Sequence, residues 1–288
     1  MLFPAITVAA LAAVWGMTAN LVRIERAASR QAALASTREL AETYEAQVLR
    51  ALREIDQGLS LVRYAMEHES DGGAAALQKL KSRGLLPSDL VFVVSILDAG
   101  GRVVASTRAI QTGADGNEDQ EALRRTGNLV VSRPWRNPQS GEWTLRFGRA
   151  LTGAAGDFRG AVTITVDAAY FVSGYEPTKL GEHGMLAVLG KDGVLRVRRS
   201  GDNVAAGDVV DFNAAAPHVA DEEAAPERVV TPWDGITRYT AARPIFGFPL
   251  AVVVGLSEVE QLASTQRDAR RYIWRAAGGS IVLVAVML

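Results

Sequence analysis

Two adjacent strand-like segments between Gly141 and Phe171 constrain the fold most strongly. In the first, bulky and apolar residues recur at every second position, the spacing of a half-buried β-strand. One face carries Trp143, Leu145, Phe147, Arg149 and Leu151, and the other carries Thr144, Arg146, Gly148 and Ala150. The second segment, Gly160 to Val166, is rich in β-branched residues. Because Gly153 and Gly156 can adopt the positive φ of a tight turn, the pattern predicts an antiparallel hairpin.

Two charged residues of this hairpin suggest a polar pocket in the sheet. Arg149 lies among apolar neighbours, and Asp167 ends the second strand, where it can also cap the short turn Ala168–Phe171. Charges placed in clefts are probabilistic markers of functional sites. The same pattern is compatible with a structural ion pair or with two solvated strand ends.

The composition excludes several classes of function. The 288 residues suffice for one or two domains with a sizeable core, and the net charge of −1 gives no support to a nucleic-acid partner. The absence of cysteine excludes disulfides, thiolate catalysis and Cys-ligated zinc, and it suits an exported protein. Because His68, His183 and His218 are far apart in the sequence, we expect neither a metal site nor a cofactor.

Enzyme motifs are missing from the sequence. It contains no Gly-x-Ser-x-Gly elbow, no Gly-rich phosphate loop ending in Lys-Ser/Thr and no His-Glu-x-x-His helix. Glu118 and Asp119 are neighbouring carboxylates without a partner histidine, and Asp221–Glu223 is an acidic run in a polar loop. We therefore assign no catalytic residue and expect no enzyme activity from these residues.

Both ends of the chain are apolar. Leu2 to Val22 contains no charge and is long enough to cross a hydrocarbon core of about 30 Å. A cleaved signal peptide is the alternative, but the run is longer than a usual signal core and no basic segment precedes it. At the other end, an apolar run from Ala276 to Leu288 follows four arginines, as a membrane span often follows a basic flank. These are Arg267, Arg270, Arg271 and Arg275. We expect the front part of a longer membrane protein.

A long helix is predicted from Arg23 to about Arg83, with an interruption at Asp71–Gly73. Apolar residues recur there at steps of three and four, and no proline occurs before Pro87. The apolar residues of this stripe are Leu34, Leu40, Tyr44, Val48, Leu52, Ile55, Leu59, Val62 and Met66. The stripe could form a coiled-coil seam or the face that packs on a sheet.

The rest of the chain reads as two similar sheets. The first would contain two strands joined at Asp98–Gly101, a short helix Glu121–Arg125, a third strand Leu129–Trp135 and then the hairpin, five antiparallel strands in all. The second sheet is predicted from five strands at 184–190, 194–199, 228–231, 236–243 and 250–256, with residues 200–227 as loop. The segments SILDAGGRVVAS and AVLGKDGVLRVR look like one hairpin used twice.

In this order of segments, and in four motifs, the chain resembles the double Cache (tandem PAS-like) extracytoplasmic sensors of bacterial transmembrane signalling proteins. The motifs are GEWTLRFGRAL, FRGAVTITVDAAYF, LGEHGMLAVLGKDGVLRVR and GFPLAVVVGLSEVE. The resemblance covers nearly all 288 residues. It implies an α+β fold in which two PAS-like antiparallel sheets lie on a long N-terminal helix between two transmembrane helices.

The resemblance and the segment pattern together divide the chain into six parts. They are a transmembrane helix (1–22), a signalling helix (23–88), a membrane-distal module (89–173), a membrane-proximal module (174–256), an exit helix (257–275) and the start of a second transmembrane helix (276–288). The arginines beside both spans would by charge alone place the modules in the cytoplasm, but that rule applies to loops up to about 60 residues. A periplasmic position, with the spans in the bacterial inner membrane, rests on the resemblance.

The resemblance also implies that the distal module binds the ligand while the proximal module relays. Five residues occupy matching motif positions: Trp143, Arg149, Asp167, Tyr170 and Phe171. Asp119 is the one residue kept from the family's frequent Asp–Arg–x–Tyr–Phe run. No aromatic-rich Arg–x–Trp–Tyr run of amino-acid sensors is present. These differences weaken the expectation of a standard amino-acid or dicarboxylate ligand.

We expect Arg149 to bind an anionic ligand group or Asp167, because a buried guanidinium needs a partner. A zwitterion would place its acid on Arg149 and its amine on Asp167 or Asp119, between walls formed by Trp143 and Tyr170. If Arg149 and Asp167 simply pair, the role is structural.

The predicted function is a ligand-sensing receptor region whose cytoplasmic output domain follows. Diguanylate cyclase or phosphodiesterase is the first expectation, followed by histidine kinase and chemoreceptor; a membrane-anchored enzyme or an adhesion module is the alternative of another class. The expected partners are a small molecule, the membrane and a second copy in a parallel homodimer packed through Leu40, Val48, Leu52 and Leu59.

Overall fold

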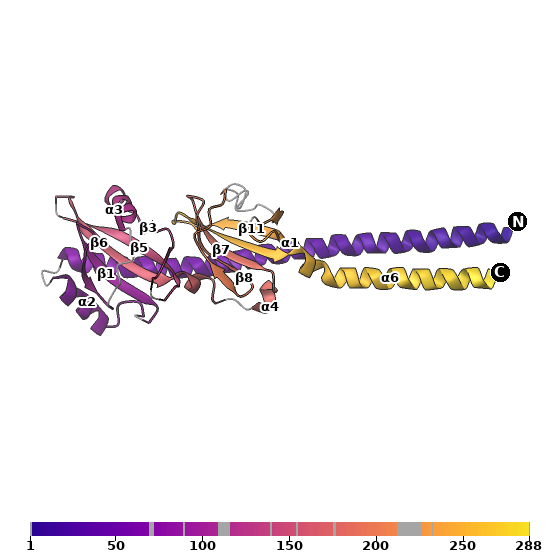
Figure 1. The fold of residues 1–288 in the computed structure, drawn as a ribbon, viewed down its shortest axis with the longest axis horizontal. Coiled ribbons are helices and arrows are strands. Elements are labelled where there is room, and N and C mark those ends of the chain that lie inside the picture. The colour runs from indigo at the N-terminus through magenta and orange to yellow at the C-terminus, as the bar shows by residue number, and fades with distance from the viewer. Residues whose placement is uncertain are drawn as a thin grey trace.

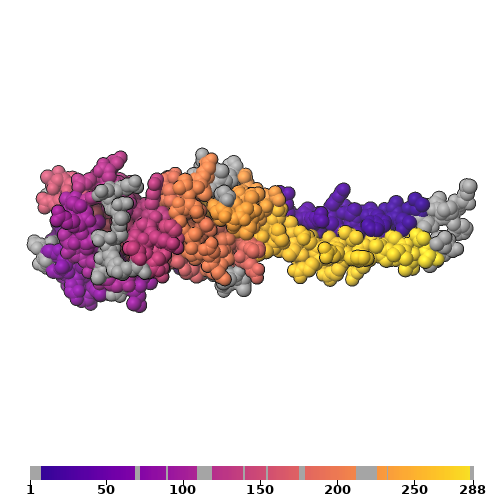
Figure 2. Space-filling model, in the orientation of Figure 1, coloured from indigo at the N-terminus to yellow at the C-terminus, as the bar shows by residue number. Residues whose placement is uncertain are grey.

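A computed structural model gives the fold as one long helix, two antiparallel sheets and a returning helix (Figure 1). It describes residues 2–68, 72–88, 90–108, 116–138, 140–153, 155–174, 177–211, 226–231 and 233–287. His218, Asp221–Glu223 and the side chain of Glu118 lie outside the described part. Figure 2 shows an elongated body from which the indigo N-terminal and the yellow C-terminal segments project side by side.

Helix α1 (Leu2–His68) carries both sheets. Seven residues of its apolar stripe are at most 8% exposed, and they form one core cluster with residues of both sheets, including Phe147 and Val252. These seven are Leu40, Tyr44, Val48, Leu52, Ile55, Leu59 and Val62. Of the two alternatives for the stripe, packing on a sheet is confirmed. The predicted dimer seam through Leu40, Val48, Leu52 and Leu59 is wrong, because these side chains are already buried within one chain.

The first sheet, here called the distal sheet, lies farther from the apolar chain ends. Its strands are β1 (Phe92–Asp98), β2 (Val103–Ser106), β3 (Val130–Val131), β4 (Trp135–Arg136), β5 (Trp143–Thr152) and β6 (Phe158–Asp167), ordered β2-β1-β6-β5-β3 with β4 also pairing to β5. The predicted β5–β6 hairpin is confirmed, with Phe147 opposite Ile164. The predicted third strand is split into β3 and β4 around Pro134, which has no amide hydrogen for a ladder.

Short helices complete the distal module. They are α2 (Gly73–Ser82), α3 (Gly116–Arg125) and the 3₁₀ helix η1 (Ala168–Phe171). Helix α3, which begins earlier than the predicted Glu121, lies over β3, β5 and β6 (Figure 1). Residues 116–120, ahead of the predicted start, are therefore also helical.

The second sheet, here called the proximal sheet, has the strand order β10-β11-β12-β7-β8-β9. Its elements are β7 (Met185–Gly190), β8 (Leu195–Ser200), β9 (Asn203–Ala205), β10 (Glu227–Val230), β11 (Thr237–Pro244) and β12 (Leu250–Ser257), with α4 (Pro177–Leu180) ahead of them. Five strands lie where the sequence predicts them. β9 lies in a segment predicted as loop, where it extends the sheet beside β8.

Helix α6 (Glu258–Met287) follows β12 and runs back beside the N-terminal half of α1, so both ends of the chain lie together (Figure 1). Hydrogen bonds join the two helices, from Trp15 Nε1 to Ser280 Oγ (3.2 Å) and from Tyr272 Oη to Glu25 Oε1 (3.2 Å). Within the described residues, only α1 has a stretch long and apolar enough by composition to cross a membrane, and none of it is buried. A second span in α6 stays a prediction.

Each sheet has an inner face packed on α1 and an outer face turned away from it. Alternation along the strands assigns the faces, since neighbouring residues point to opposite sides and paired residues of adjacent strands share a side. In the distal sheet Phe147 and Ile164 are inner, whereas Arg146 and Thr165 are outer. In the proximal sheet Val188 and Val252 are inner, whereas Ala187 and Val253 are outer.

Candidate ligand-binding site

Arg149 is held by a residue of the long helix. Its Nε donates to Asp56 Oδ1 (2.6 Å) and its Nη2 to Asp56 Oδ2 (3.0 Å), while Nη1 donates to the Gly127 carbonyl (3.2 Å). A forked arginine–carboxylate pair of this kind is among the stronger polar contacts in proteins. Arg149 therefore fixes α1 to the inner face of the distal sheet, and its cationic group is already neutralised.

Asp167 lies away from Arg149, so the predicted pairing of these two residues is wrong. Asp167 is opposite Thr144, five residues along β5 from Arg149, which corresponds to about 17 Å of strand. An odd offset also puts the two side chains on opposite faces of the sheet. Asp167 Oδ1 instead accepts from Ala169 N (2.8 Å) and caps η1, as its position in the sequence predicts.

The environment of Asp167 favours its protonated form. Burial raises the pKa of this carboxyl above its ordinary value of 3.8, and nearby Glu142 adds to the effect, although the Ala169 N–H lowers it. Asp167 lies at the end of the outer face, where it is partly buried. Its role as a ligand residue stays a prediction.

Trp143 and Tyr170 lie on the α1 side of the distal sheet. Trp143 packs against the main core below the Arg136 guanidinium (5.5 Å to the ring centroid), close to Gly207 of the proximal module.

Tyr170 packs edge-to-face on Phe92, with ring centroids 5.2 Å apart. It lines a cavity of about 380 Å³ with Gln47 and Glu54 of α1. Burial, followed by the charge of Glu54, raises the pKa of Tyr170. The predicted site residues are therefore divided between the two faces of the sheet.

Arg146 is the outer-face cation that the sequence prediction missed. Its Nη1 lies 3.7 Å from Asp119 Oδ2 of α3, beyond hydrogen-bond length, and its guanidinium lies 6.0 Å from the Trp135 ring centroid. The side chain is 17% exposed, and within the described residues its guanidinium donates no hydrogen bond. An arginine has five N–H donors, so this one retains an unfilled capacity to bind an anion.

The surroundings of Arg146 are polar although they are buried. Ser95, Thr144 and Thr163 on the outer face are at most 7% exposed. Trp135 Nε1 is also buried, without a hydrogen-bond partner in the described part of the chain. The outer face thus combines a cation, an indole donor and hydroxyls with the carboxylates of Asp119 and Asp167.

Gly148 lets α3 approach this face. A Cβ at this position would lie 3.1 Å from Leu123 Cδ2 of α3, closer than most side chains tolerate. The sequence did contain a signal for this site. Thr144, Arg146 and Gly148 occupy every second position of β5 and therefore share one face of the strand. What the sequence did not show is that α3 brings Asp119 to this face rather than to that of Arg149.

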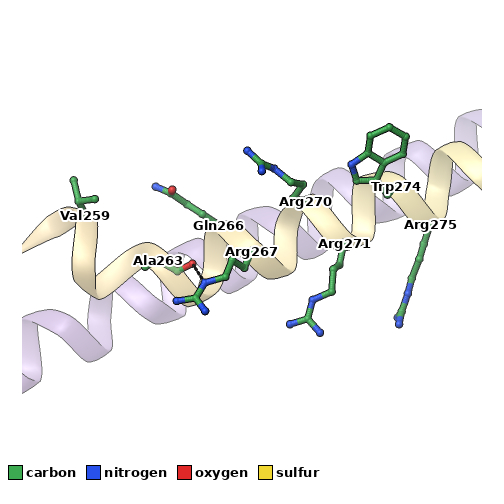
Figure 3. Close-up of a pocket in the computed structure, with 8 residues that line it drawn as sticks. All are labelled: Val259, Ala263, Gln266, Arg267, Arg270, Arg271, Trp274 and Arg275. Atoms are coloured by element: carbon green, nitrogen blue, oxygen red, sulfur yellow. Dashed lines mark hydrogen bonds between the residues drawn. The ribbon is translucent and has the colours of Figure 1, made fainter.

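Two other groups of residues are less suited to a ligand. A hollow of about 770 Å³ runs along α6 and is lined by Val259, Ala263, Gln266, Arg267, Arg270, Arg271, Trp274 and Arg275 (Figure 3). All of these belong to one helix, so the hollow is an open surface, and it coincides with the predicted basic flank.

Elsewhere, potential ligand atoms of Glu182, His183 and Glu260 lie within 4.8 Å of one another. This grouping was invisible in the sequence, because Glu260 is distant from His183, and its exposed position does not require a metal.

Comparison with known proteins identifies the fold. No protein-family model and no curated protein matches the chain. Among solved structures, the extracellular domain of a protein assigned as the histidine kinase rpHK1S-Z16 is 23% identical, with a TM-score of 0.59 over 79% of this chain and 95% of that one. The ligand-binding domain of the Pseudomonas aeruginosa amino-acid chemoreceptor PctB with L-Arg is 14% identical (TM-score 0.55; 77% and 94% covered).

A third similar structure is the ligand-binding domain of the Pseudomonas fluorescens chemoreceptor CtaA with L-isoleucine, 16% identical with a TM-score of 0.55 and coverage of 83% and 98%. These neighbours are extracellular or ligand-binding domains of a histidine kinase and of chemoreceptors, and they contain two antiparallel sheets. The chain therefore shares their fold, the double Cache fold.

Proposed function

We propose that this chain is the extracytoplasmic sensing region of a transmembrane receptor and that the outer face of its distal sheet binds a small zwitterionic molecule. The observation that carries the proposal is Arg146, a mostly buried guanidinium without a hydrogen-bonded partner among the described residues. Asp119 balances the charge at 3.7 Å, but buried N–H donors that form no hydrogen bond are costly. A ligand carboxylate would supply the missing acceptors.

The residues around Arg146 suit the rest of such a ligand. Trp135 Nε1 can donate a second hydrogen bond to the carboxylate. Asp119, at 3.7 Å from Arg146, and Asp167, at the end of β6, can accept from an amine. The predicted ligand class is retained, with Arg146 in the place given to Arg149. The solved neighbours PctB and CtaA hold the amino acids L-Arg and L-isoleucine, which belong to this class.

The bound ligand would act on the receptor through the helices. A ligand shifts a two-state receptor only by its differential affinity, and a change from 1:99 to 99:1 needs about 5.5 kcal/mol. Among the described elements, α1 and α6 are the ones that connect the sheets with the apolar ends. A parallel homodimer remains part of the proposal, but its contact would use exposed positions of α1, such as Ile24 and Tyr64.

We propose a cytoplasmic output domain and assign no enzyme activity to the 288 residues themselves. Diguanylate cyclase or phosphodiesterase is the first candidate for this domain, followed by histidine kinase and chemoreceptor. The neighbours include both a histidine kinase and chemoreceptors, so the fold is compatible with several outputs. The coding sequence after Leu288 tests this part, and a stop codon there would contradict it.

Ligand-induced thermal stabilisation tests the sensing proposal. The full chain in nanodiscs would be screened against the amino acids, γ-aminobutyrate, polyamines and organic acids. We expect Arg146→Ala to fold and to lose the stabilisation by any hit. Arg159→Ala is the matched control, because Arg159 lies on the same sheet and its side chain is 68% exposed. A hit whose stabilisation survives both Arg146→Ala and Asp119→Ala would place the binding site elsewhere.

A further inference from the structure

We propose a second small-molecule site on the outer face of the proximal sheet, specific for an uncharged apolar molecule that carries an oxygen acceptor. A cavity of about 390 Å³ lies there, within the range of about 300–1,000 Å³ usual for ligand pockets. Its walls are mainly apolar, and they include Met185, Ala187, Leu195, Val210 and Val253.

The cavity is a pocket that opens to the surface and not a closed void in the core. Its rim includes Val209 and Val230, which are 78% and 57% exposed. Its floor is tightly packed, since Met185, Ala187 and Leu195 are at most 1% exposed. An apolar pocket of this size with a well-packed floor is typical of a small-molecule site.

Two buried polar atoms define the chemistry of the occupant. Trp233 Nε1 and Thr240 Oγ1 belong to residues that line the cavity, and neither has a hydrogen-bond partner in the described part of the chain. Thr240 is only 4% exposed. The indole can only donate, whereas the hydroxyl can donate or accept, so an oxygen such as that of a phenol, ketone or lactone would suit either atom.

The charges nearby argue against an ionised ligand. Arg198 stacks on the Trp233 ring at 5.3 Å, but its Nε is bound to Asp208 Oδ2 at 2.6 Å. Asp211, which is itself engaged by another group, is the acidic residue among the described lining residues. No described lining residue is cationic, in contrast to Arg146 on the distal sheet. The proximal site would therefore bind a different class of molecule from the distal one.

The position of the cavity would give such a ligand a role in signalling. Thr240 is on β11 and Val253 is on β12, and β12 continues directly into α6. An occupant that contacts both strands lies next to the element that connects the proximal sheet with the apolar end of the chain. The site would thus provide a second input close to the exit helix.

Binding of p-cresol and toluene to the full chain in nanodiscs tests this proposal. The two probes differ only by the hydroxyl, and the resonance of the Trp233 indole N–H reports binding at the site. We expect saturable binding of both, with p-cresol about fivefold tighter, the size of one net hydrogen bond. Partition of the probes into lipid is the same for every variant and can be subtracted.

Three variants sharpen the test. Thr240→Val, of the same shape, should reduce the preference for p-cresol, and Ala187→Leu should fill the cavity and abolish binding of both probes. Thr37→Val on α1, at a threonine that is also buried, is the matched control and should change neither. If Ala187→Leu does not fold, Leu195→Phe replaces it. Absence of saturable binding, equal affinity for both probes, or binding that survives the filled cavity would overturn the proposal. Retained amino-acid stabilisation of Ala187→Leu would show that the distal site is independent.

Discussion

The outer faces of the two sheets have the same position relative to α1 and opposite chemistry. On the distal sheet, the buried outer residues include Ser95, Thr144 and Thr163. On the proximal sheet, the corresponding surface carries Ala187 and Val253 beside a largely apolar cavity. The comparison shows that the fold fixes where a pocket can form, while the side chains on one face of each sheet decide what it can bind.

A fully buried arginine and a mostly buried arginine make the contrast clearest. Arg238 on the proximal sheet is fully buried, and its donors are occupied by Asp234 (2.7 and 2.9 Å), Ser200 Oγ (2.9 Å) and the His183 carbonyl (2.7 Å). Arg146 on the distal sheet has only a distant carboxylate at 3.7 Å. A saturated arginine holds a structure together, whereas an unsaturated one is available to a ligand.

The largest expected effect comes from removing the partner of Arg238. Asp234→Ala should lower the free energy of unfolding by about 3–5 kcal/mol, because it leaves a buried guanidinium without its carboxylate. Denaturant unfolding of the full chain measures this. The double variant Asp234→Ala/Arg238→Met should be less destabilised than Asp234→Ala, because it leaves no unpaired guanidinium. If Asp234→Ala is as stable as the wild-type protein, the ion pair is not structural.

The same pair predicts a pH dependence. Although burial alone would raise it, the hydrogen bonds from Arg238, Thr231 and Ile236 hold the pKa of Asp234 well below its ordinary value of 3.8. Since the folded state releases this proton more readily than the unfolded state, its contribution to stability is complete above about pH 4 and is lost as the pH falls further. The melting temperature should fall between pH 6 and pH 2.5, and it should fall less in Asp234→Ala than in the wild-type protein. An equal decline in both proteins would contradict the assignment.

Arginines on the two faces of β5 should separate stability from binding. Arg149→Ala should cost about 1–3 kcal/mol, because Asp56 loses its forked partner, and it should retain ligand-induced stabilisation. Arg146→Ala should change stability by less than about 1 kcal/mol, because it breaks only a 3.7 Å ion pair. Thermal unfolding with and without a ligand measures both. The reverse pattern would return the binding role to Arg149.

The smallest effect is expected at the contact between α3 and the distal sheet. Gly148→Ala should cost about 1 kcal/mol, because its Cβ would press on Leu123 and move the helix that carries Asp119. Ligand affinity should fall with it. Gly127→Ala is the control, because nothing lies within 4 Å of a Cβ there. Calorimetric binding to both variants would show whether α3 forms part of the distal site.

The sequence alone determined the local elements. The alternation from Trp143 to Leu151 and the glycines at 153 and 156 gave the β5–β6 hairpin, and the stripe from Leu40 to Val62 gave the packed face of α1. These patterns depend on neighbouring residues and on turn chemistry, so they can be read without the rest of the chain. The separation of Arg149 from Asp167 could also have been predicted, since the hairpin turn fixes the register.

Only the tertiary structure decided which charges meet. Asp56 lies 93 residues before Arg149, and Asp119 reaches Arg146 because α3 packs over Gly148. The difference between a satisfied and an unsatisfied arginine, and between the two outer faces, depends on which side of each sheet α1 covers. That choice is made by the burial of apolar surface from distant segments, which no local periodicity records.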